Sequence, residues 1–79
     1  MELVIRNKSG EFIVSFKSFL GEFIFKYLMT HPKLQISTKN IGGVNYRGFE
    51  NTTNETFAGK NDLIDFQIKP GDFVAIKNV

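Results

Sequence analysis

The chain of 79 residues contains no cysteine and a single histidine, His31. Without cysteine, a disulfide framework and a zinc site built on thiolates are both excluded. A hydrolytic triad would have to use His31 as its base, and no Gly-x-Ser-x-Gly motif supplies a nucleophile. The carboxylates of Asp62, Asp65 and Asp72 lack the spacing of a calcium-binding loop. We therefore expect no metal, no cofactor and no enzymatic activity.

Long apolar runs are missing as well. No stretch approaches the ~20 apolar residues that a membrane-spanning helix needs, and the first residues lack the basic region and the long apolar segment of a signal peptide. Gly59 and Lys60 match the end of a phosphate-binding loop, but Asn54 stands where its first glycine belongs and Asn61 where its Ser or Thr belongs. Together with the lack of cysteine, these absences predict a cytoplasmic protein without membrane contact.

The residues that are present suffice for one small hydrophobic core. Hydrophobic residues make up 42% of the chain, and nine of them are phenylalanine. This apolar surface can offset the entropy lost when the chain is ordered. A chain of this length forms one domain and buries only about 60% of the surface that it exposes when unfolded. We therefore expect residues 1–79 to form a single domain with little room for a deep cavity.

Alternating apolar residues predict strands near both ends of the chain. The segments 2–7 and 11–17 alternate with a period of two and are joined by turn residues, so we expect a β-hairpin. Apolar residues alternate again over 64–68, and a last strand is expected at 73–76. Between these two strands, residues 69–72 have proline second and glycine third, which is typical of a type II turn. Such a turn does not match the twist of a tight hairpin, so the two strands are expected to meet at a corner.

The segment 18–31 fits two structures. Its aromatic and β-branched centre suits a strand, but six apolar residues also fall on one broad face of a helix, which Ser18 would cap and Pro32 would end. Those six residues are Phe19, Leu20, Phe23, Ile24, Tyr27 and Leu28. We expect the helix, which places Phe25 and Met29 off the main apolar face, as an exposed patch for a partner.

The middle of the chain is polar and rich in glycine. A short strand is expected at 34–38, followed by a long polar loop region at about 39–62. A strand at 44–49 and one helical turn at 54–58 would shorten this loop. The predicted fold class is α+β: a small antiparallel β-sheet with one helix, at about 18–31, packed on it. An all-β fold, SH3-like or a small barrel, is the alternative.

Residues 39–51 interleave basic, amide and aromatic side chains with glycines. A surface of this kind can stack on bases and contact phosphates. The charge pattern supports such a role, because 23–49 has no acidic residue whereas 50–72 carries five. Residues 47–49 also match the opening of an RNA-binding motif, although the match ends there. The alternative is a flexible loop whose two aromatic rings are part of the core.

The predicted binding residues come from two segments of the chain. Those of the central segment are Lys39, Asn45, Tyr46, Arg47 and Phe49, and those of the helix are Phe25 and Met29. A nucleic-acid surface would also use Lys26 and Lys33.

The small size, the lack of catalytic groups and the many phenylalanines predict a non-catalytic protein-binding module. Phe, Ile, Asn, Lys and Tyr supply 34 of the 79 residues, and these are residues of AT-rich codons. The composition thus favours a small phage or mobile-element protein that binds and inhibits a host or defence protein in the host cytoplasm. Two alternatives stay open. One is a nucleic-acid-binding protein that uses the basic and aromatic segment 23–49, and the other is a small homo-oligomeric structural or virion component.

Overall fold

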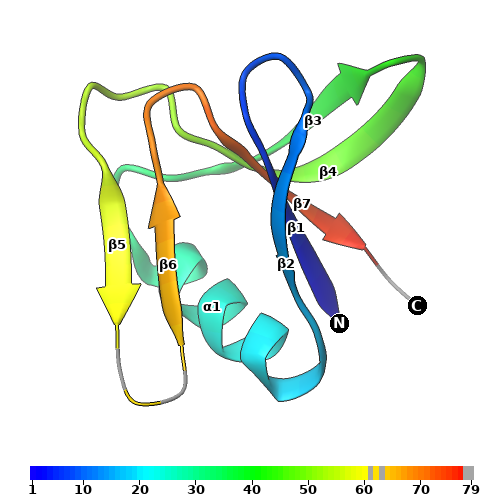
Figure 1. Cartoon of the computed structure of the whole chain (residues 1–79). Coiled ribbons are helices and arrows are strands. Elements are labelled where there is room, and N and C mark those ends of the chain that lie inside the picture. The colour runs from blue at the N-terminus through cyan, green and yellow to red at the C-terminus, as the bar shows by residue number, and fades with distance from the viewer. Residues whose placement is uncertain (61, 63, 78–79) are drawn as a thin grey trace.

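The computed structural model describes residues 1–60, 62 and 64–77, which form two antiparallel sheets and one helix (Figure 1). In chain order the elements are β1 (Glu2–Arg6), β2 (Phe12–Phe16), α1 (Ser18–Thr30), β3 (Ile36–Ile41), β4 (Val44–Glu50), β5 (Phe57–Lys60), β6 (Asp65–Ile68) and β7 (Phe73–Lys77). The larger sheet has five strands in the order β2-β1-β7-β4-β3, and the smaller sheet pairs β5 with β6. The predicted α+β class is confirmed, with a helix after β2.

β1 and β2 form the predicted hairpin. It contains one bulge, where the register shifts and Arg6 lies opposite Phe12. In the connecting turn, the side-chain oxygen of Asn7 accepts hydrogen bonds from the backbone N–H groups of Ser9 and Glu11, each at 3.0 Å. β2 is one edge of the five-stranded sheet and β3 is the other.

The corner predicted between the last two strands is confirmed. The N–H of Asp72 donates to the carbonyl oxygen of Lys69 at 2.9 Å, and Gly71 between them has a φ of 87°. A left-handed φ at this position of a type II turn requires glycine or a similar residue. Beyond the turn the two strands separate, because β6 pairs with β5 whereas β7 pairs with β1 and β4.

The region 39–62, predicted as a long polar loop, is built largely of strands, and the strand expected within it at 44–49 is β4. β3 and β4 form a second hairpin, closed by Gly42 and Gly43, which have φ values of 60° and 86°. Two successive left-handed residues form the turn that matches the twist of paired strands. The helical turn predicted at 54–58 is absent, and β5 begins at Phe57 in its place.

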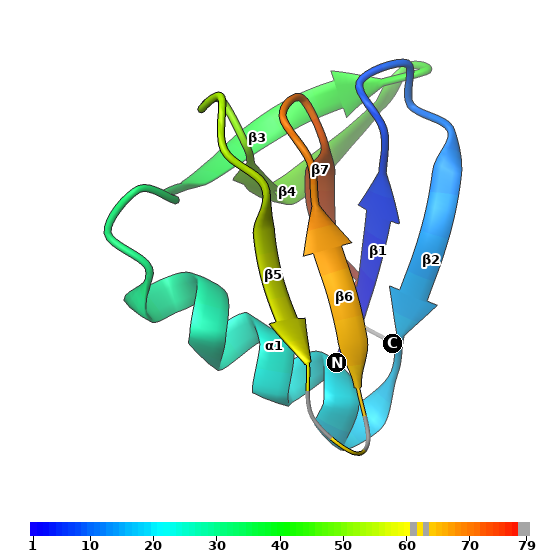
Figure 2. The same ribbon diagram turned by 60° about the vertical axis from the view of Figure 1, so that its left-hand side comes forward.

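One face of the five-stranded sheet carries the main core. α1 and the β5–β6 hairpin cover this face (Figure 2). The ring of Phe66 on β6 meets the ring of Phe16 on β2 and that of Tyr27 on α1 edge to face, with centroids 6.5 Å and 5.6 Å apart. The buried residues of this core are Leu3, Ile5, Ile24, Leu28, Leu34, Phe49, Phe57, Ile64, Phe66, Ile68 and Val74.

The opposite face of the sheet holds a smaller cluster. Val4, Phe73 and Ala75 are buried there, and Ile41 and Tyr46 pack against them. Both faces of the central strands are therefore apolar, which explains the nearly continuous apolar sequence of β1 and β7.

The helix has the predicted bounds, but the predicted cap at its start is wrong. Ser18 is not the cap: Lys17 occupies the N-cap position without a side-chain hydrogen bond, and Ser18 is the first helical residue, with a φ of 55°. At the other end, the N–H of His31 donates to the carbonyl oxygen of Leu28 at 3.2 Å, and Pro32 follows.

Candidate functional site

The helix lies on the sheet in a different rotation from the one predicted. Gly21, Ile24 and Leu28 are its buried residues, spaced three and four apart on one face. A Cβ on Gly21 would lie 2.7 Å from the carbonyl oxygen of Met1 and 2.9 Å from that of Phe16. At this point the helix is too close to the ends of β1 and β2 for any side chain. The close contact directs Gly21 toward the sheet and sets the rotation of the whole helix.

This rotation exposes two aromatic rings that the helical pattern places in the core. Phe19 is 65% exposed and Phe23 is 53% exposed. Phe25, predicted to lie on an exposed patch, packs on the core instead, and its ring meets that of Phe49 with centroids 6.0 Å apart. Met29, predicted for the same patch, is exposed.

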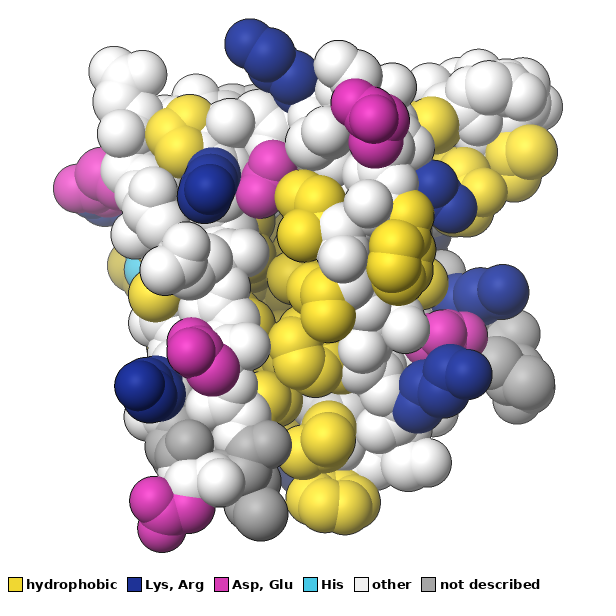
Figure 3. All heavy atoms as spheres, viewed as in Figure 1, with side chains coloured by type: hydrophobic (Ala, Val, Ile, Leu, Met, Phe, Trp, Pro, Cys, Tyr) yellow, Lys and Arg dark blue, Asp and Glu magenta, His cyan; other side chains and the backbone are white. Residues whose placement is uncertain are grey.

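Four large apolar side chains are exposed on β2 and the first half of α1. Phe12 and Ile13 belong to the strand, and Phe19 and Phe23 belong to the helix. We call these four residues the β2–α1 surface. Figure 3 shows hydrophobic side chains gathered in a column over this part of the molecule. Large apolar side chains that stay exposed are candidate sites of protein–protein interaction.

The central segment does not form the single surface that the sequence predicts. Lys39 lies directly opposite Tyr46, and Thr38 lies directly opposite Arg47. Because successive side chains of a strand point to opposite faces, Arg47 leaves the sheet on the other side from Lys39 and Tyr46. Phe49 is 1% exposed within the main core, so its ring is not accessible to a base.

Tyr46 and Asn45 are engaged with neighbours inside the molecule. Tyr46 is half-buried against the smaller cluster, and the guanidinium carbon of Arg6 lies 5.5 Å from the centre of its ring. The side-chain oxygen of Asn45 accepts a hydrogen bond from the side-chain amide of Asn40 at 3.0 Å. The interpretation with both aromatic rings packed inward is therefore the better one, although the segment is a hairpin rather than a flexible loop.

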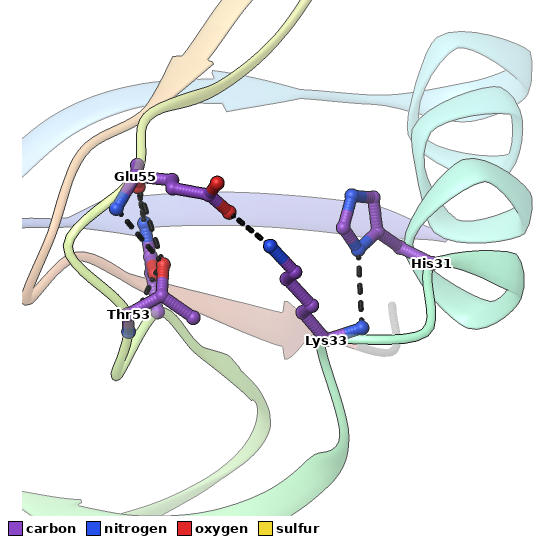
Figure 4. Close-up of polar contacts among 5 residues, drawn as sticks. His31, Lys33, Thr53 and Glu55 are labelled. Atoms are coloured by element: carbon purple, nitrogen blue, oxygen red, sulfur yellow. Dashed lines mark hydrogen bonds and ion pairs between the residues drawn. The ribbon is translucent and has the colours of Figure 1, made fainter.

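Folding brings the basic and acidic parts of the chain together. The ammonium nitrogen of Lys39 lies 2.8 Å from a carboxylate oxygen of Glu50, and that of Lys33 lies 2.6 Å from one of Glu55 (Figure 4). The hydrogen bond and the positive charge of Lys33 lower the pKa of Glu55 below its usual value. Two of the four cations in the segment 23–49 are thus paired with acids that follow in the sequence, whereas Lys26 and Arg47 are exposed.

His31 has a local role at the end of α1. Its Nδ1 accepts a hydrogen bond from the N–H of Lys33 at 3.3 Å (Figure 4). The His31 ring lies edge-on to that of Phe57, with centroids 4.4 Å apart. In the described part of the chain, no group of three or more histidines and carboxylates is arranged to hold a metal ion. Asp72 is buried in the turn before β7, where its carboxylate accepts the N–H of Lys69 at 2.9 Å.

Neither protein-family models nor curated proteins nor solved structures give a match to this chain. Within the described ranges, α1 is too short to cross a bilayer, and no other helix is present there.

Sequence reasoning missed the two exposed phenylalanines of α1 and the two apolar side chains of β2. One signal was present for the helix, because a glycine in the middle of a helix costs about 1 kcal/mol relative to alanine and usually marks a close contact. Placing Gly21 against the sheet would have directed Phe19 and Phe23 toward solvent. No comparable signal marks Phe12 and Ile13, whose exposure depends on the position of β2 at the sheet edge.

Proposed function

We propose that this protein is a non-catalytic protein-binding module that docks its partner on the helical half of the β2–α1 surface. The observation that carries this proposal is the exposure of Phe19 and Phe23, which lie four residues apart on one face of α1. Aromatic side chains are common energetic anchors of protein interfaces, and two rings one helical turn apart fit the spacing of helix-mediated recognition.

The surroundings of the two rings support docking rather than burial by the chain itself. The inward face of the same helix is already occupied by Ile24 and Leu28, both of which are fully buried. Turning Phe19 and Phe23 inward would therefore expose two core residues and force Gly21 away from the strand ends. The two phenylalanines stay available to a partner at no cost to the core.

The composition favours a phage or mobile-element origin, so the proposed partner is a host or defence protein that is inhibited when bound. A photo-activatable phenylalanine analogue placed at position 23 would capture a protein that docks on this face. The capture should be repeated in the background of Phe19→Ser and in that of Val44→Ser. Val44 is the matched control, because it is 51% exposed but lies on the β3–β4 hairpin.

We expect one defined crosslinked species in extracts of the host cells, retained with Val44→Ser and lost with Phe19→Ser. The captured protein should then lose its own activity when the purified module is added. A crosslinking pattern that is the same in both backgrounds would refute docking on this face. If the captured protein keeps its full activity, the proposed inhibition is refuted but docking on this face is not.

A further inference from the structure

We propose that two copies of this chain associate by antiparallel pairing of their β2 strands, with a two-fold axis at Val14. This would join two five-stranded sheets into one continuous sheet. The association uses the free edge of β2 and does not depend on the partner proposed for Phe19 and Phe23.

The free edge of β2 is unusually apolar. Its five residues, Phe12–Phe16, include no charged residue and no proline, two of the devices that protect a sheet edge from pairing with another chain, and a third device, a bulge, is present only at the Phe12 end. In the described structure β2 pairs with β1 alone, and no strand lies on its outer side (Figures 1 and 2). Phe12 is 59% exposed and Ile13 is 47% exposed. Because β1 is the only described strand that pairs with β2, the backbone groups on the outer side of β2 are available to a second strand.

The charges on either side of β2 select a second copy as the occupant. Glu11 precedes the strand and Lys17 follows it, and both are exposed. In antiparallel pairing about Val14, Glu11 of one copy lies opposite Lys17 of the other. One ion pair between a glutamate and a lysine therefore forms at each end of the paired strands. Parallel pairing in register would instead place glutamate beside glutamate and lysine beside lysine, which is unfavourable.

The apolar residues agree with the same register. Phe12 of one copy lies opposite Phe16 of the other, Ile13 opposite Ser15, and Val14 opposite itself. Shifting the register by one residue in either direction breaks both ion pairs and places Lys17 opposite Phe12, or Glu11 opposite Phe16. The bulge in the β1–β2 hairpin leaves Ile13 without a partner on β1, so the proposed register requires Phe12 and Ile13 to pair regularly on the outer side of β2.

The contact is small, so a reversible dimer is expected. One strand of five residues buries less than the roughly 800 Å² per partner of a typical stable complex. Dimerisation should therefore depend on protein concentration, and the melting temperature should rise with concentration because association stabilises the folded state.

Charge reversal tests the register directly. Sedimentation equilibrium of the full chain over about a hundredfold range of concentration should show a monomer–dimer equilibrium. Glu11→Lys and Lys17→Glu should each weaken dimerisation at least about tenfold. The double variant, Glu11→Lys with Lys17→Glu, should restore it, because the ion pairs form again with their signs exchanged. Glu11 and Lys17 of one chain lie about 20 Å apart at 3.3 Å per residue, so a contact within one chain cannot explain the rescue.

Two further variants test which of the two sheet edges forms the dimer. Ile13→Lys places a charge in the middle of the β2 edge and should abolish the dimer, whereas Ser37→Lys places the same charge on the β3 edge and should leave the dimer unchanged. A chain that stays monomeric at every concentration would overturn the proposal. A dimer that tolerates Ile13→Lys, or a double charge reversal without rescue, would overturn it equally.

Discussion

Asn51 shows how a single buried amide holds the polar middle of the chain in place. It is 0% exposed, and its side-chain nitrogen donates to the carbonyl oxygens of Glu55 and Ile68 at 2.7 Å and 3.0 Å. Its side-chain oxygen accepts the N–H and the hydroxyl of Thr53 at 3.0 Å and 2.6 Å. One side chain thus joins the loop after β4 to the end of β6. A buried polar group is tolerated here because its hydrogen bonds are made.

Asn51→Asp should lower the free energy of unfolding by about 3 kcal/mol at neutral pH, because a buried carboxylate would replace the amide donor opposite two carbonyl oxygens. Burial raises the pKa of such a carboxyl group, so the loss should shrink at acidic pH, where the protonated group can donate again. Urea unfolding at both pH values measures this change. Asn45→Asp is the control, since Asn45 is exposed and keeps its acceptor oxygen. A loss that is equal at both pH values would contradict the explanation.

At the scale of the element, the sequence predicts that α1 is a helix but does not predict how this helix is rotated on the sheet. The helix and its end at His31 follow from apolar spacing and from Pro32, which are local features. Its rotation depends on the contact of Gly21 with Met1 and Phe16, which is not local. Sequence periodicity therefore predicts the helix, but the exposed part of the candidate site could not be derived from it.

Phe23 and Phe25 make this distinction measurable, because they lie two residues apart in the same helix. Phe25→Ala should cost about 2–3 kcal/mol, somewhat less than a fully buried phenylalanine, through loss of its contact with Phe49. Phe23→Ala should cost less than about 0.5 kcal/mol, as for other exposed positions. Chemical denaturation of the two variants measures both losses in the free energy of unfolding. A larger loss for Phe23→Ala than for Phe25→Ala would mean that the helix lies in the rotation predicted from its apolar spacing.

The strands show the same limit of sequence reasoning. β1, β2, β6 and β7 were predictable because their apolar residues alternate or cluster where the core needs them. For the β3–β4 hairpin, strands were expected at 34–38 and 44–49, but their pairing was not, because most of the side chains are polar or glycine and carry no clear alternation. Its turn residues, Gly42 and Gly43, were the one available signal.

At the scale of the whole molecule, the uneven charge of the chain is reduced by the fold. The acidic second half supplies Glu50 and Glu55 to Lys39 and Lys33, and strand alternation separates Arg47 from Tyr46. The residues proposed for a nucleic-acid surface therefore do not share one accessible face. This separation could not be predicted from sequence, because it depends on which strands pair.

We accordingly expect weak binding of single- and double-stranded oligonucleotides, with little change between ~50 and ~200 mM salt. Fluorescence anisotropy of labelled oligonucleotides measures both the affinity and its salt dependence. Lys26→Gln combined with Arg47→Gln removes the two exposed cations of the segment and should change nothing. Tight binding that falls steeply with salt, and that is lost in the double variant, would support the nucleic-acid hypothesis instead.

The position of β7 between β1 and β4 has a mechanical consequence. Glu2 pairs with Lys77 at one end of the antiparallel β1–β7 ladder, and Arg6 pairs with Phe73 at the other. A force that pulls Met1 and Lys77 apart acts across the strands at the Glu2 end, so it loads the hydrogen bonds one after another rather than all together. The central strands of the sheet, which are among the best buried parts of the fold, would therefore separate one hydrogen bond at a time from the Glu2 end, under low force.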